Sequence, residues 1–483
     1  MNTRRLLLLL AVAVLGLSSC RQKNSTIIEL KSEDDLSGLT VSCTAGNYYE
    51  RKYSLRPDVK VFATSSEADA VQAVRQGLAD VFVSDEVALT EERLKELGMK
   101  CALRGTEAFD VAFGIRKGND KFRAELNKFI ASSREDGTLD AVIAHWIKGG
   151  PAVPFEEPKN LDKSNPVRCA LCVNVAPVSF VGEGGRWDGM DPEIVRRFSA
   201  SIGRPVEFIY QDVGSASISL QAGMVDIMAA CLYATEERKK SIDFSDNYYL
   251  CHPGFFTKDA AAAVKMTVWD RLKMSLVTEQ RWKLITGGLV KTLVITLFSI
   301  LLGTVLGAGV CAMKRSRRRW VRSLIKGYGA FIQGTPVLVV LLIMFYVIFA
   351  HSGLSGTVVA IFTFALFFAW SSGNIFDNSI SYVPKGQTEA GLSLGFTPFK
   401  TFTGIVFPQA LKRGLPMYAG ECVSLLKSTS IVGYIAIVDL TRASDLIRSR
   451  TFDALIPLLI ITITYFVLAW IIRSLLNLLL IKK

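Results

Sequence analysis

A series of long apolar segments after residue 263 constrains this chain more than any other feature. A helix that crosses the hydrocarbon core of a bilayer needs about 20 mostly apolar residues. Four segments are long enough to form such a helix or most of one: residues 289–313, 336–350, 357–375 and 454–481. A shorter fifth candidate is 431–440, extended backward through residue 425. We therefore expect residues 264–483 to form an all-α membrane domain with five spans.

Charge indicates how these spans are oriented. The formal net charge is +12, and seven basic residues with no acidic one lie in residues 314–326, between two apolar segments. Such a loop is typical of the cytoplasmic side of a membrane protein rather than of a nucleic-acid-binding face. With five spans, the basic segments 314–326, 385–427 and 482–483 share that side. This predicts a multi-pass protein of the bacterial plasma (inner) membrane, with a cytoplasmic C-terminus and an N-terminal region outside.

The N-terminus, residues 1–20, has the pattern of an export signal. Arg4 and Arg5 precede about 12 apolar residues, which are too few to span a bilayer. The tetrapeptide at residues 17–20 resembles the bacterial lipobox, in which the cysteine receives a lipid, and this predicts lipidation of Cys20. An uncleaved anchor is the alternative. In both cases the following residues are exported.

Between the signal and the membrane domain, the pattern changes to alternating strands and helices. One α/β region covers residues 36–148 and a second covers 166–258, joined by a proline-containing linker at 149–165. An internal similarity relates residues 76–81 to residues 222–227, each a helix end with glycine followed by a buried strand. The two regions are therefore expected to be two similar lobes.

The residues that usually hold metals are few. The chain has three histidines, and the spacing of Cys169 and Cys172 places the two thiols on opposite faces of an expected strand. We expect these cysteines in the core and no metal site. Six exported cysteines permit disulfides without defining a pairing. No Walker A pattern occurs, so no cofactor is expected in this chain and ATP hydrolysis is not its own activity.

One segment between the third and fourth expected spans identifies a family. Residues 383–391 (VPKGQTEAG) are followed by Gly395, Ile405 and residues 408–411 (PQAL). This resembles the EAA loop of ABC importer permeases of the polar amino-acid type, such as the glutamine and histidine permeases. The resemblance implies that Glu389, Ala390, Gly391 and Gly395 couple the permease to a separate ATPase, which binds ATP and Mg²⁺. It also implies two permease halves, as a homodimer or with a sister permease.

The exported region resembles the two-lobed solute-binding proteins of the same importers, with an α/β fold of the type II periplasmic-binding-protein kind. Blocks at residues 176–180, 189–191, 235–238 and 243–249 are similar to the first lobe, and blocks within 36–148 are similar to the second. The order of the lobes is reversed, which predicts a circularly permuted domain. Two truncated tandem modules, or lobes that pair across a dimer, are the alternatives.

The same resemblance implies the solute and the residues that bind it. An α-amino acid needs a cation for its carboxylate and an anion for its ammonium group. Arg238 and Asp85 occupy the family positions for these two roles. Other expected ligand-binding residues, several of which depart from the family pattern, are Asn47, Tyr48, Asn174, Phe180, Cys231 and Tyr233. In the membrane domain, Asp377 and Lys427 are a candidate ion pair; the alternative is that both lie in the cytoplasmic headgroup zone.

These features together predict a non-enzymatic membrane subunit of an ABC importer for amino acids or similar small polar solutes. Its exported domain captures the solute, and its cytoplasmic loop contacts the partner ATPase. A ligand-gated receptor or channel is the alternative from another class, since two-lobed modules also gate pores. An exported hydrolase is a third possibility, but the positions of the three histidines do not suggest a catalytic triad.

Overall fold

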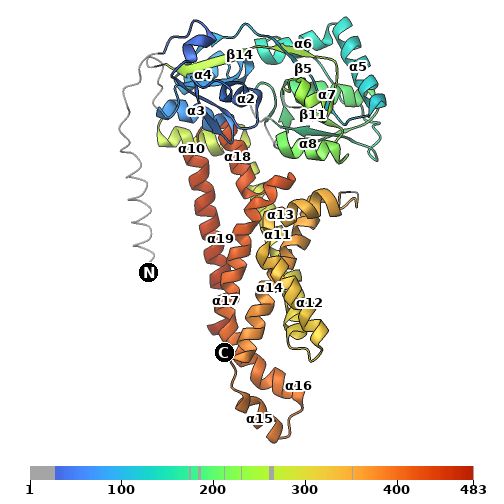
Figure 1. Cartoon of the computed structure of the whole chain (residues 1–483), viewed down its shortest axis with the longest axis vertical. Helices are drawn as coiled ribbons and strands as arrows, with labels where there is room; N and C mark the ends of the chain where they lie inside the picture. Colours follow the sequence, from blue (N-terminus) through green and yellow to red (C-terminus); the bar gives the residue numbers. More distant parts are fainter. Residues whose placement is uncertain are drawn as a thin grey trace. The chain divides into compact units, whose positions relative to one another are not determined.

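The computed structural model describes residues 28–172, 176–182, 186–211, 213–229, 231–259, 266–350 and 352–481. The predicted signal peptide, Cys20 and Asn174 lie outside these residues. The chain forms two compact units (Figure 1). Unit 1 takes its residues from Met1–Phe109 and Leu250–Met266, and unit 2 from Asp110–Tyr249 and Thr267–Lys483.

Unit 1 is built on a five-stranded sheet. Its strands, in hydrogen-bonded order, are β2 (Lys60–Thr64), β1 (Thr40–Thr44), β3 (Val81–Asp85), β14 (Pro253–Lys258) and β4 (Met99–Arg104). Strand β1 is parallel to β2 and β3, whereas β14 is antiparallel to β3 and β4. The helices of the unit are α2 (Tyr48–Ser54), α3 (Glu67–Gln76) and α4 (Glu91–Leu97), with short 3₁₀ turns η2 (Glu33–Leu36) and η3 (Glu86–Ala88).

Unit 2 contains a second sheet with the same order of strands. These are β10 (Val206–Tyr210), β7 (Val167–Leu171), β11 (Ile227–Ala229), β6 (Gly114–Ile115) and β12 (Asp243–Phe244), and here β6 is the antiparallel insertion. A small hairpin consists of β8 (Phe180–Val181) and β9 (Trp187–Asp188). The accompanying helices are α5 (Asp120–Glu135), α6 (Thr138–Lys148), α7 (Met190–Ser201), α8 (Val213–Gln221) and α9 (Glu236–Lys239).

The internal similarity seen in the sequence lies at equivalent places in the two sheets. Gly77 ends α3 with φ +76° and Gly223 follows α8 with φ +71°, a conformation that glycine adopts without strain. The aspartate a few residues later caps the start of the sheet's second strand. Asp80 accepts the backbone N–H of Thr40 at 2.8 Å, and Asp226 accepts that of Arg168 at 3.0 Å. The prediction of two similar α/β substructures is confirmed.

The two compact units divide the α/β region at other places than the expected lobes. The chain passes between the units within β5 (Phe109–Val111), within β13 (Tyr249–Cys251) and between Met266 and Thr267. Residues 110–148, expected with residues 36–109, belong to unit 2, and β14, expected with residues 166–249, belongs to unit 1. Hydrophobic patterning finds a strand but does not report which sheet it joins.

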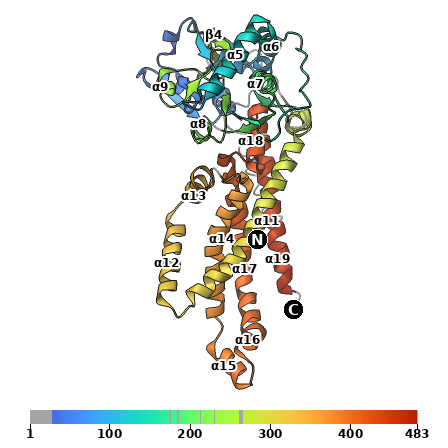
Figure 2. The same ribbon diagram turned by 90° about the vertical axis from the view of Figure 1, so that its right-hand side faces the viewer.

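The helical part of unit 2 contains three long apolar helices, α11 (Trp282–Lys314), α14 (Gly356–Ser381) and α19 (Leu455–Ile481). Two bent helix pairs raise the number of candidate spans to as many as five (Figures 1 and 2). Helices α11 and α14 pack closely because small residues face each other. A Cβ on Gly303 would lie 2.9 Å from the carbonyl oxygen of Ala365, and the Ser372 hydroxyl donates to the carbonyl of Gly303 at 3.2 Å.

The second expected span, at residues 336–350, is displaced. The long helix is α12 (Arg319–Gly334), and a bend of 104° separates it from α13 (Val337–Ile343) and the π-helical turn η6 (Met344–Ile348). Pro336 explains the bend, because it lacks an N–H and disfavours helical geometry at Thr335, which is extended.

The fourth expected span, at residues 425–440, is displaced too. The long helix is α17 (Phe407–Ser428), which the sequence analysis assigned to the cytoplasmic segment. Lys412, Arg413 and Glu421 lower its apolar content, so hydropathy missed it. It packs against α14, where a Cβ on Gly414 would meet the Ser379 hydroxyl. The turn η8 (Thr429–Ile435) and, beyond a 55° bend, helix α18 (Leu440–Thr451) come next in the chain.

Candidate functional site

In unit 1, three of the predicted ligand-binding residues gather around Tyr49. Asp85 ends β3, and its Oδ1 accepts a hydrogen bond from the Tyr49 hydroxyl at 2.9 Å. Tyr48 contacts the rings of Tyr49 and Phe109 edge-on, at centroid distances of 5.6 and 4.8 Å. Burial raises the pKa of the Tyr48 phenol, so it stays a neutral hydroxyl. Tyr49 itself is buried and was not singled out from the sequence.

Asn47, a predicted ligand-binding residue, uses its side-chain oxygen in a hydrogen bond with the backbone. Its side-chain oxygen accepts the N–H of Glu50 at 2.8 Å and so caps the N-terminus of α2. Asparagine is a preferred residue at this helix position, so the cap alone accounts for it. The cap also holds Tyr48 and Tyr49 in the first turn of α2, which positions the hydroxyl that contacts Asp85.

A buried carboxyl next to Asp85 escaped the sequence analysis. Glu67 is the first residue of α3, and its Oε1 accepts the Ser84 hydroxyl at 2.6 Å. Its Oε2 is buried and has no hydrogen-bond partner in the described part of the chain. Burial raises the pKa of Glu67 to about 7. An acidic residue at a helix start usually indicates a favourable charge on the helix dipole, which is why the pattern gave no signal.

In unit 2, the corresponding segment comes after β11. Cys231 adopts a positive φ of 48°, and its backbone N–H donates to Asp191 Oδ2 at 3.2 Å. The hydroxyl of Tyr248 donates to Asp191 Oδ1 at 2.6 Å, and Asp191 is fully buried. Asp191 and Tyr248 belong to sequence blocks that resemble the first lobe. Their partnership, however, needs the fold, because 57 residues separate them.

Arg238 lies in α9, close to two other predicted residues. Thr235 caps this helix by accepting the Arg238 N–H, and the Arg238 guanidinium donates to the carbonyl of Tyr233 at 3.2 Å. Both Cys231 and Tyr233 are buried, whereas Arg238 is half-buried. Three predicted residues of unit 2, Cys231, Tyr233 and Arg238, therefore lie in the segment that follows β11, the strand equivalent to β3.

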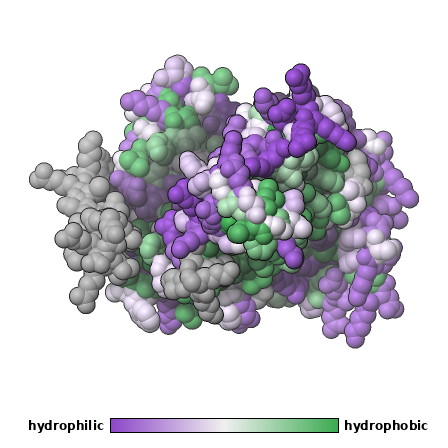
Figure 3. Space-filling model, turned by 90° about the horizontal axis from the view of Figure 1, so that it is seen from below, coloured by the Kyte–Doolittle hydropathy of each residue, from purple (hydrophilic) through white to green (hydrophobic). Residues whose placement is uncertain are grey.

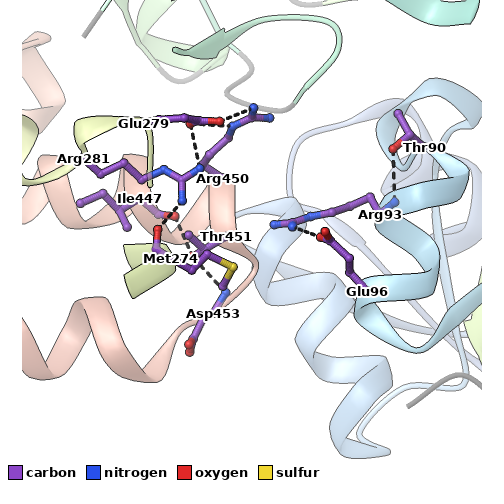
Figure 4. Close-up of polar contacts among 10 residues, drawn as sticks. All are labelled: Thr90, Arg93, Glu96, Met274, Glu279, Arg281, Ile447, Arg450, Thr451 and Asp453. Carbon is purple, nitrogen blue, oxygen red and sulfur yellow. Dashed lines mark hydrogen bonds and ion pairs between the residues drawn. The ribbon is translucent and has the colours of Figure 1, made fainter. Parts of the chain in front are cut away.

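Phe180, another predicted ligand-binding residue, contacts an arginine and a tryptophan. The Arg450 guanidinium of α18 lies 4.1 Å from the centre of its ring, and Trp146 contacts it edge-on at 5.9 Å. Arg450 also forms an ion pair with Glu279 at 2.9 Å, which Arg281 contacts at 2.8 Å (Figure 4). One face of Phe180 is thus occupied by the helical part of the same unit, which sequence patterns gave no means to foresee.

A second contact joins the sheet of unit 2 to the helical part. The guanidinium of Arg442, in α18, stacks 4.2 Å from the ring centre of Tyr210, the last residue of β10. The neighbouring Gln211 donates to the hydroxyl of Tyr346 at 3.4 Å. A cation–π contact of this kind attracts the guanidinium electrostatically to the face of the ring, so it holds two elements together without burying apolar surface. Helix α18 and the turn η6 therefore contact the end of β10 in this sheet.

The EAA-like segment forms a helical hairpin beyond α14. It consists of α15 (Lys385–Ser393), α16 (Pro398–Thr401) and the π-helical turn η7 (Phe402–Val406). Gly395 ends α15 with φ +82°, and the Phe396 N–H bonds back to the carbonyl of Gly391 at 3.1 Å. A Cβ on Gly391 would lie 2.6 Å from Thr401 Cγ2, so glycine at this position allows α15 to pack closely against α16.

The surface of this hairpin is exposed and mixed in character. Glu389 and Ala390 are exposed, and Leu394 and Phe399 are 76% and 75% exposed. Figure 3 views the molecule from the end where α15 lies and shows hydrophobic side chains among hydrophilic ones. Of the four predicted coupling residues, Glu389 and Ala390 are exposed in the middle of α15. The other two, Gly391 and Gly395, shape the hairpin.

A cavity of about 320 Å³ lies among the membrane helices. Its walls combine aromatic rings with polar groups, and its lining includes Gln333, Phe364, Phe368, Trp370, Asn374, Glu421 and Ser428. A polar cavity at membrane depth is costly to maintain, so such sites mark transport pathways. Hydropathy could not locate it, because the lining comes from α12, α14 and α17.

The predicted pair of Asp377 and Lys427 is wrong. Asp377 contacts Lys314 at 3.2 Å and Arg315 at 3.0 Å, both at the end of α11, and Lys427 is exposed. Lys314 also donates to Asn374 at 2.7 Å. The sequence offered many cations for one carboxylate, and the α11–α14 packing selects between them.

The cysteines of the α/β sheets behave as expected. Cys169 is buried in β7, and Cys172 is half-buried just beyond it, so the pair packs in the core. Cys43 is buried in β1, and burial raises the pKa of its thiol to about 12. No disulfide joins the cysteines in the part of the chain that the structure describes.

Known proteins resemble both parts of this chain. The family of bacterial extracellular solute-binding proteins, family 3, matches residues 167–394. The L-cystine transport system permease protein TcyB of Bacillus subtilis (strain 168) is 32% identical over 214 residues, which are 44% of this chain and 90% of that protein. The nopaline transport system permease protein NocM of Agrobacterium fabrum is 34% identical over 173 residues, covering 34% of this chain and 72% of that protein. A crystal structure of an amino acid ABC transporter with histidines matches at 28% identity and a TM-score of 0.40, covering 46% of this chain and 100% of that one.

A bundle of membrane helices with an exposed helical hairpin, preceded by solute-binding α/β sheets, defines a transport permease that carries its own binding domain. The chain belongs to the family of amino-acid ABC transporter permeases. It is the multi-pass membrane subunit of an ABC importer with an extracellular binding domain. The predicted family and function class are confirmed.

Proposed function

We propose that this chain imports a free amino acid. Its binding domain recognises the α-ammonium group and the α-carboxylate of the solute. The observation that carries the proposal is a pair of opposite charges: a carboxylate at the end of the third strand of one sheet, and a guanidinium in helix α9, which follows the third strand of the other sheet. Asp85 ends the third strand of the sheet in unit 1, and Arg238 comes after the third strand of the sheet in unit 2. A carboxylate binds the ammonium group, and a guanidinium binds the carboxylate through two parallel hydrogen bonds.

The binding domain is proposed to be one circularly permuted module. Each sheet holds a full set of five strands, and the linker 149–165 joins α6 to β7 within unit 2. The linker contacts α7, where Arg197 donates to the carbonyl of Val153 at 2.8 Å and its guanidinium lies 4.8 Å from the ring centre of Phe155. The match to solute-binding proteins starts at residue 167, the first residue of β7. These features support a linker that joins two ancestral termini.

The hairpin of α15 and α16 is proposed to dock on a separate ATPase subunit, which binds ATP and Mg²⁺. Exposed Glu389 and the flanking apolar side chains form the docking face, and Gly391 and Gly395 give the hairpin its shape. We further propose that two permease halves, as a homodimer or with a sister permease, form the pathway. In this arrangement the C-terminus is cytoplasmic and Cys20 carries a lipid.

The membrane cavity is proposed as the solute's next position along the pathway. Gln333, Asn374 and Glu421 present hydrogen-bonding groups there, and aromatic side chains line the rest. A zwitterionic solute needs such groups to leave water. The membrane part would thus accept the same chemistry as the binding domain.

Calorimetric titration of the full-length protein in nanodiscs with the natural amino acids, including L-cystine, tests the proposal. We expect saturable binding of one amino acid or a small group of them. Replacement Arg238→Gln should weaken that binding about 30- to 100-fold, because a charge-assisted contact contributes about 2–3 kcal/mol.

The neighbouring residue supplies a matched control. Lys239 is exposed and pairs only with Glu236 among the described ion pairs, so Lys239→Gln should leave the affinity within about twofold. Equal effects of both substitutions, or no binding by a folded protein, would contradict the assignment. In the assembled transporter, Glu389→Lys should abolish solute-stimulated ATP hydrolysis and leave solute affinity intact. A receptor or channel would show no such hydrolysis.

A further inference from the structure

Helix α10 (Val268–Leu276) precedes the first membrane span and carries an apolar face that is exposed at its N-terminal end and half-buried at Leu272 and Leu276. Val268, Trp269, Leu272 and Leu276 lie at positions i, i+1, i+4 and i+8, which share one side of a helix. Val268 is 63% exposed and Trp269 is 73% exposed. A capping box between Thr267 and Asp270 fixes the start of the helix. The apolar exposure therefore belongs to an ordered element.

Ion pairs hold the opposite side of α10 against the membrane bundle. The Arg271 guanidinium grips Asp453 with two hydrogen bonds of 2.6 and 2.5 Å, and Asp453 is 7% exposed. Arg281 donates to the carbonyl of Met274 and pairs with Glu279, which Arg450 also contacts (Figure 4). These contacts fix the rotation of α10, so its apolar face cannot turn inward.

The level of α10 coincides with the ends of two spans. Helix α11 begins at Trp282, shortly after α10, and α19 begins at Leu455, two residues after the Asp453 that holds α10. Figure 1 shows α10 crosswise at the ends of these helices. Trp282, Val290 and Leu293 on α11 are exposed apolar side chains as well. This surface of α11 faces lipid in a membrane protein.

We propose that α10 is an interfacial helix whose apolar face lies in the outer leaflet, at the boundary between headgroups and acyl chains. Tryptophan prefers this boundary, and Lys273 at the edge of the face can extend its ammonium to the phosphates. A second protein is a poorer occupant. A nine-residue helix is only about 13 Å long, and four side chains are far less than the roughly 800 Å² per partner of a stable interface. Lipid requires no such area.

Quenching of tryptophan fluorescence by brominated lipids tests the inference in the full-length protein. The chain is reconstituted in nanodiscs with phosphatidylcholine brominated at carbons 6 and 7 or at carbons 11 and 12, and the Trp269→Phe spectrum is subtracted. We expect the Trp269 emission to be quenched several-fold more by the shallow bromines than by the deep ones, and weakly by iodide. Trp187, in β9 of the binding domain, is the matched control. Its emission, obtained by subtracting the Trp187→Phe spectrum in the same way, should show no lipid quenching. Strong iodide quenching without lipid quenching would overturn the proposal.

A photo-crosslinking residue at position 269 separates lipid from a protein partner. Because Trp269 is largely exposed, the replacement should not disturb folding, and unchanged binding of the solute checks this. The expected product is a lipid adduct detected by mass spectrometry. A band that links two copies of the chain, or this chain to another subunit, would overturn the assignment to lipid.

Discussion

The two sheets of the binding domain share a scaffold and differ in the residues at and just after the end of their third strand. In each sheet the second strand (β1 or β7) lies between two strands parallel to it. The fourth strand (β14 or β6) is antiparallel and lies between the third strand and the last. At the end of β3 the chain presents Asp85, held by the Tyr49 hydroxyl. After β11 it presents Cys231 and Tyr233, both buried, and then Arg238.

This difference shows how a duplicated fold acquires complementary halves. The scaffold repeats because backbone pairing and the glycine turns at Gly77 and Gly223 impose the same geometry. The segments that follow carry no such constraint: β3 ends in an aspartate, whereas an arginine lies in helix α9, after β11. Each half also contains a buried carboxyl group with a different task. Asp191 organises unit 2 through Tyr248 and Cys231, whereas Glu67 of unit 1 has one oxygen without a partner in the described chain.

Removing the buried carboxylate of unit 2 should have the largest effect. Asp191→Ala leaves the buried hydroxyl of Tyr248 and the N–H of Cys231 without an acceptor, so we expect unit 2 to lose about 3 kcal/mol of stability. Pulsed thiol labelling in urea measures this in the full-length protein. Cys169 in β7 reports unit 2, and Cys43 in β1 reports unit 1. Equal changes at both thiols would contradict the assignment to one unit.

The partly exposed carboxylate of unit 1 should affect binding instead. Asp85→Asn keeps the shape but removes the charge, so we expect solute affinity to fall about 100-fold while labelling of Cys43 changes little. The comparison is Asp58→Asn, an exposed aspartate paired with Arg56 in the same unit, which should not alter binding. A large loss of stability from Asp85→Asn would make this residue structural, like Asp191.

Glu67 should make unit 1 sensitive to pH. Its folded pKa of about 7 exceeds the ordinary value of 4.5, so the folded state binds the proton more tightly than the unfolded state. Its contribution to stability is complete below pH 4.5 and is lost as the pH rises through 7, at about 1.4 kcal/mol for each unit of pKa difference. Glu67→Gln should remove this trend from Cys43 labelling, normalised to the unfolded thiol. A trend that persists in the variant would assign it to another group.

The smallest effects should be equal in the two sheets. Asp80→Ala and Asp226→Ala each remove the acceptor for the N–H of Thr40 or Arg168, and each should cost about 1 kcal/mol in its own unit. Cys43 labelling measures the first and Cys169 labelling the second. Asp226 also lies 3.6 Å from Arg204, a half-exposed pair that adds little. Unequal costs of more than about 1 kcal/mol would break the equivalence of the two turns.

Much of this architecture could be predicted from local patterns. The apolar segments predicted the membrane domain, and the EAA-like residues predicted the family. The glycine turn repeated at residues 76–81 and 222–227 predicted the similar sheets. The predictions that failed concern long-range choices: the partner of Asp377 and the polar helix α17.

The sequence by itself determined that this chain inserts into a membrane, exports an α/β region and contacts an ATPase of its family, because each of these depends on composition or on a short run of residues. Only the tertiary structure decided that Tyr49 holds Asp85, that Tyr248 and Cys231 surround Asp191, and that α10 is locked by Asp453. The physical reason is that hydrophobic periodicity acts over a few residues and sets local structure. Hydrogen bonds and ion pairs between distant residues form only once packing has brought their elements together.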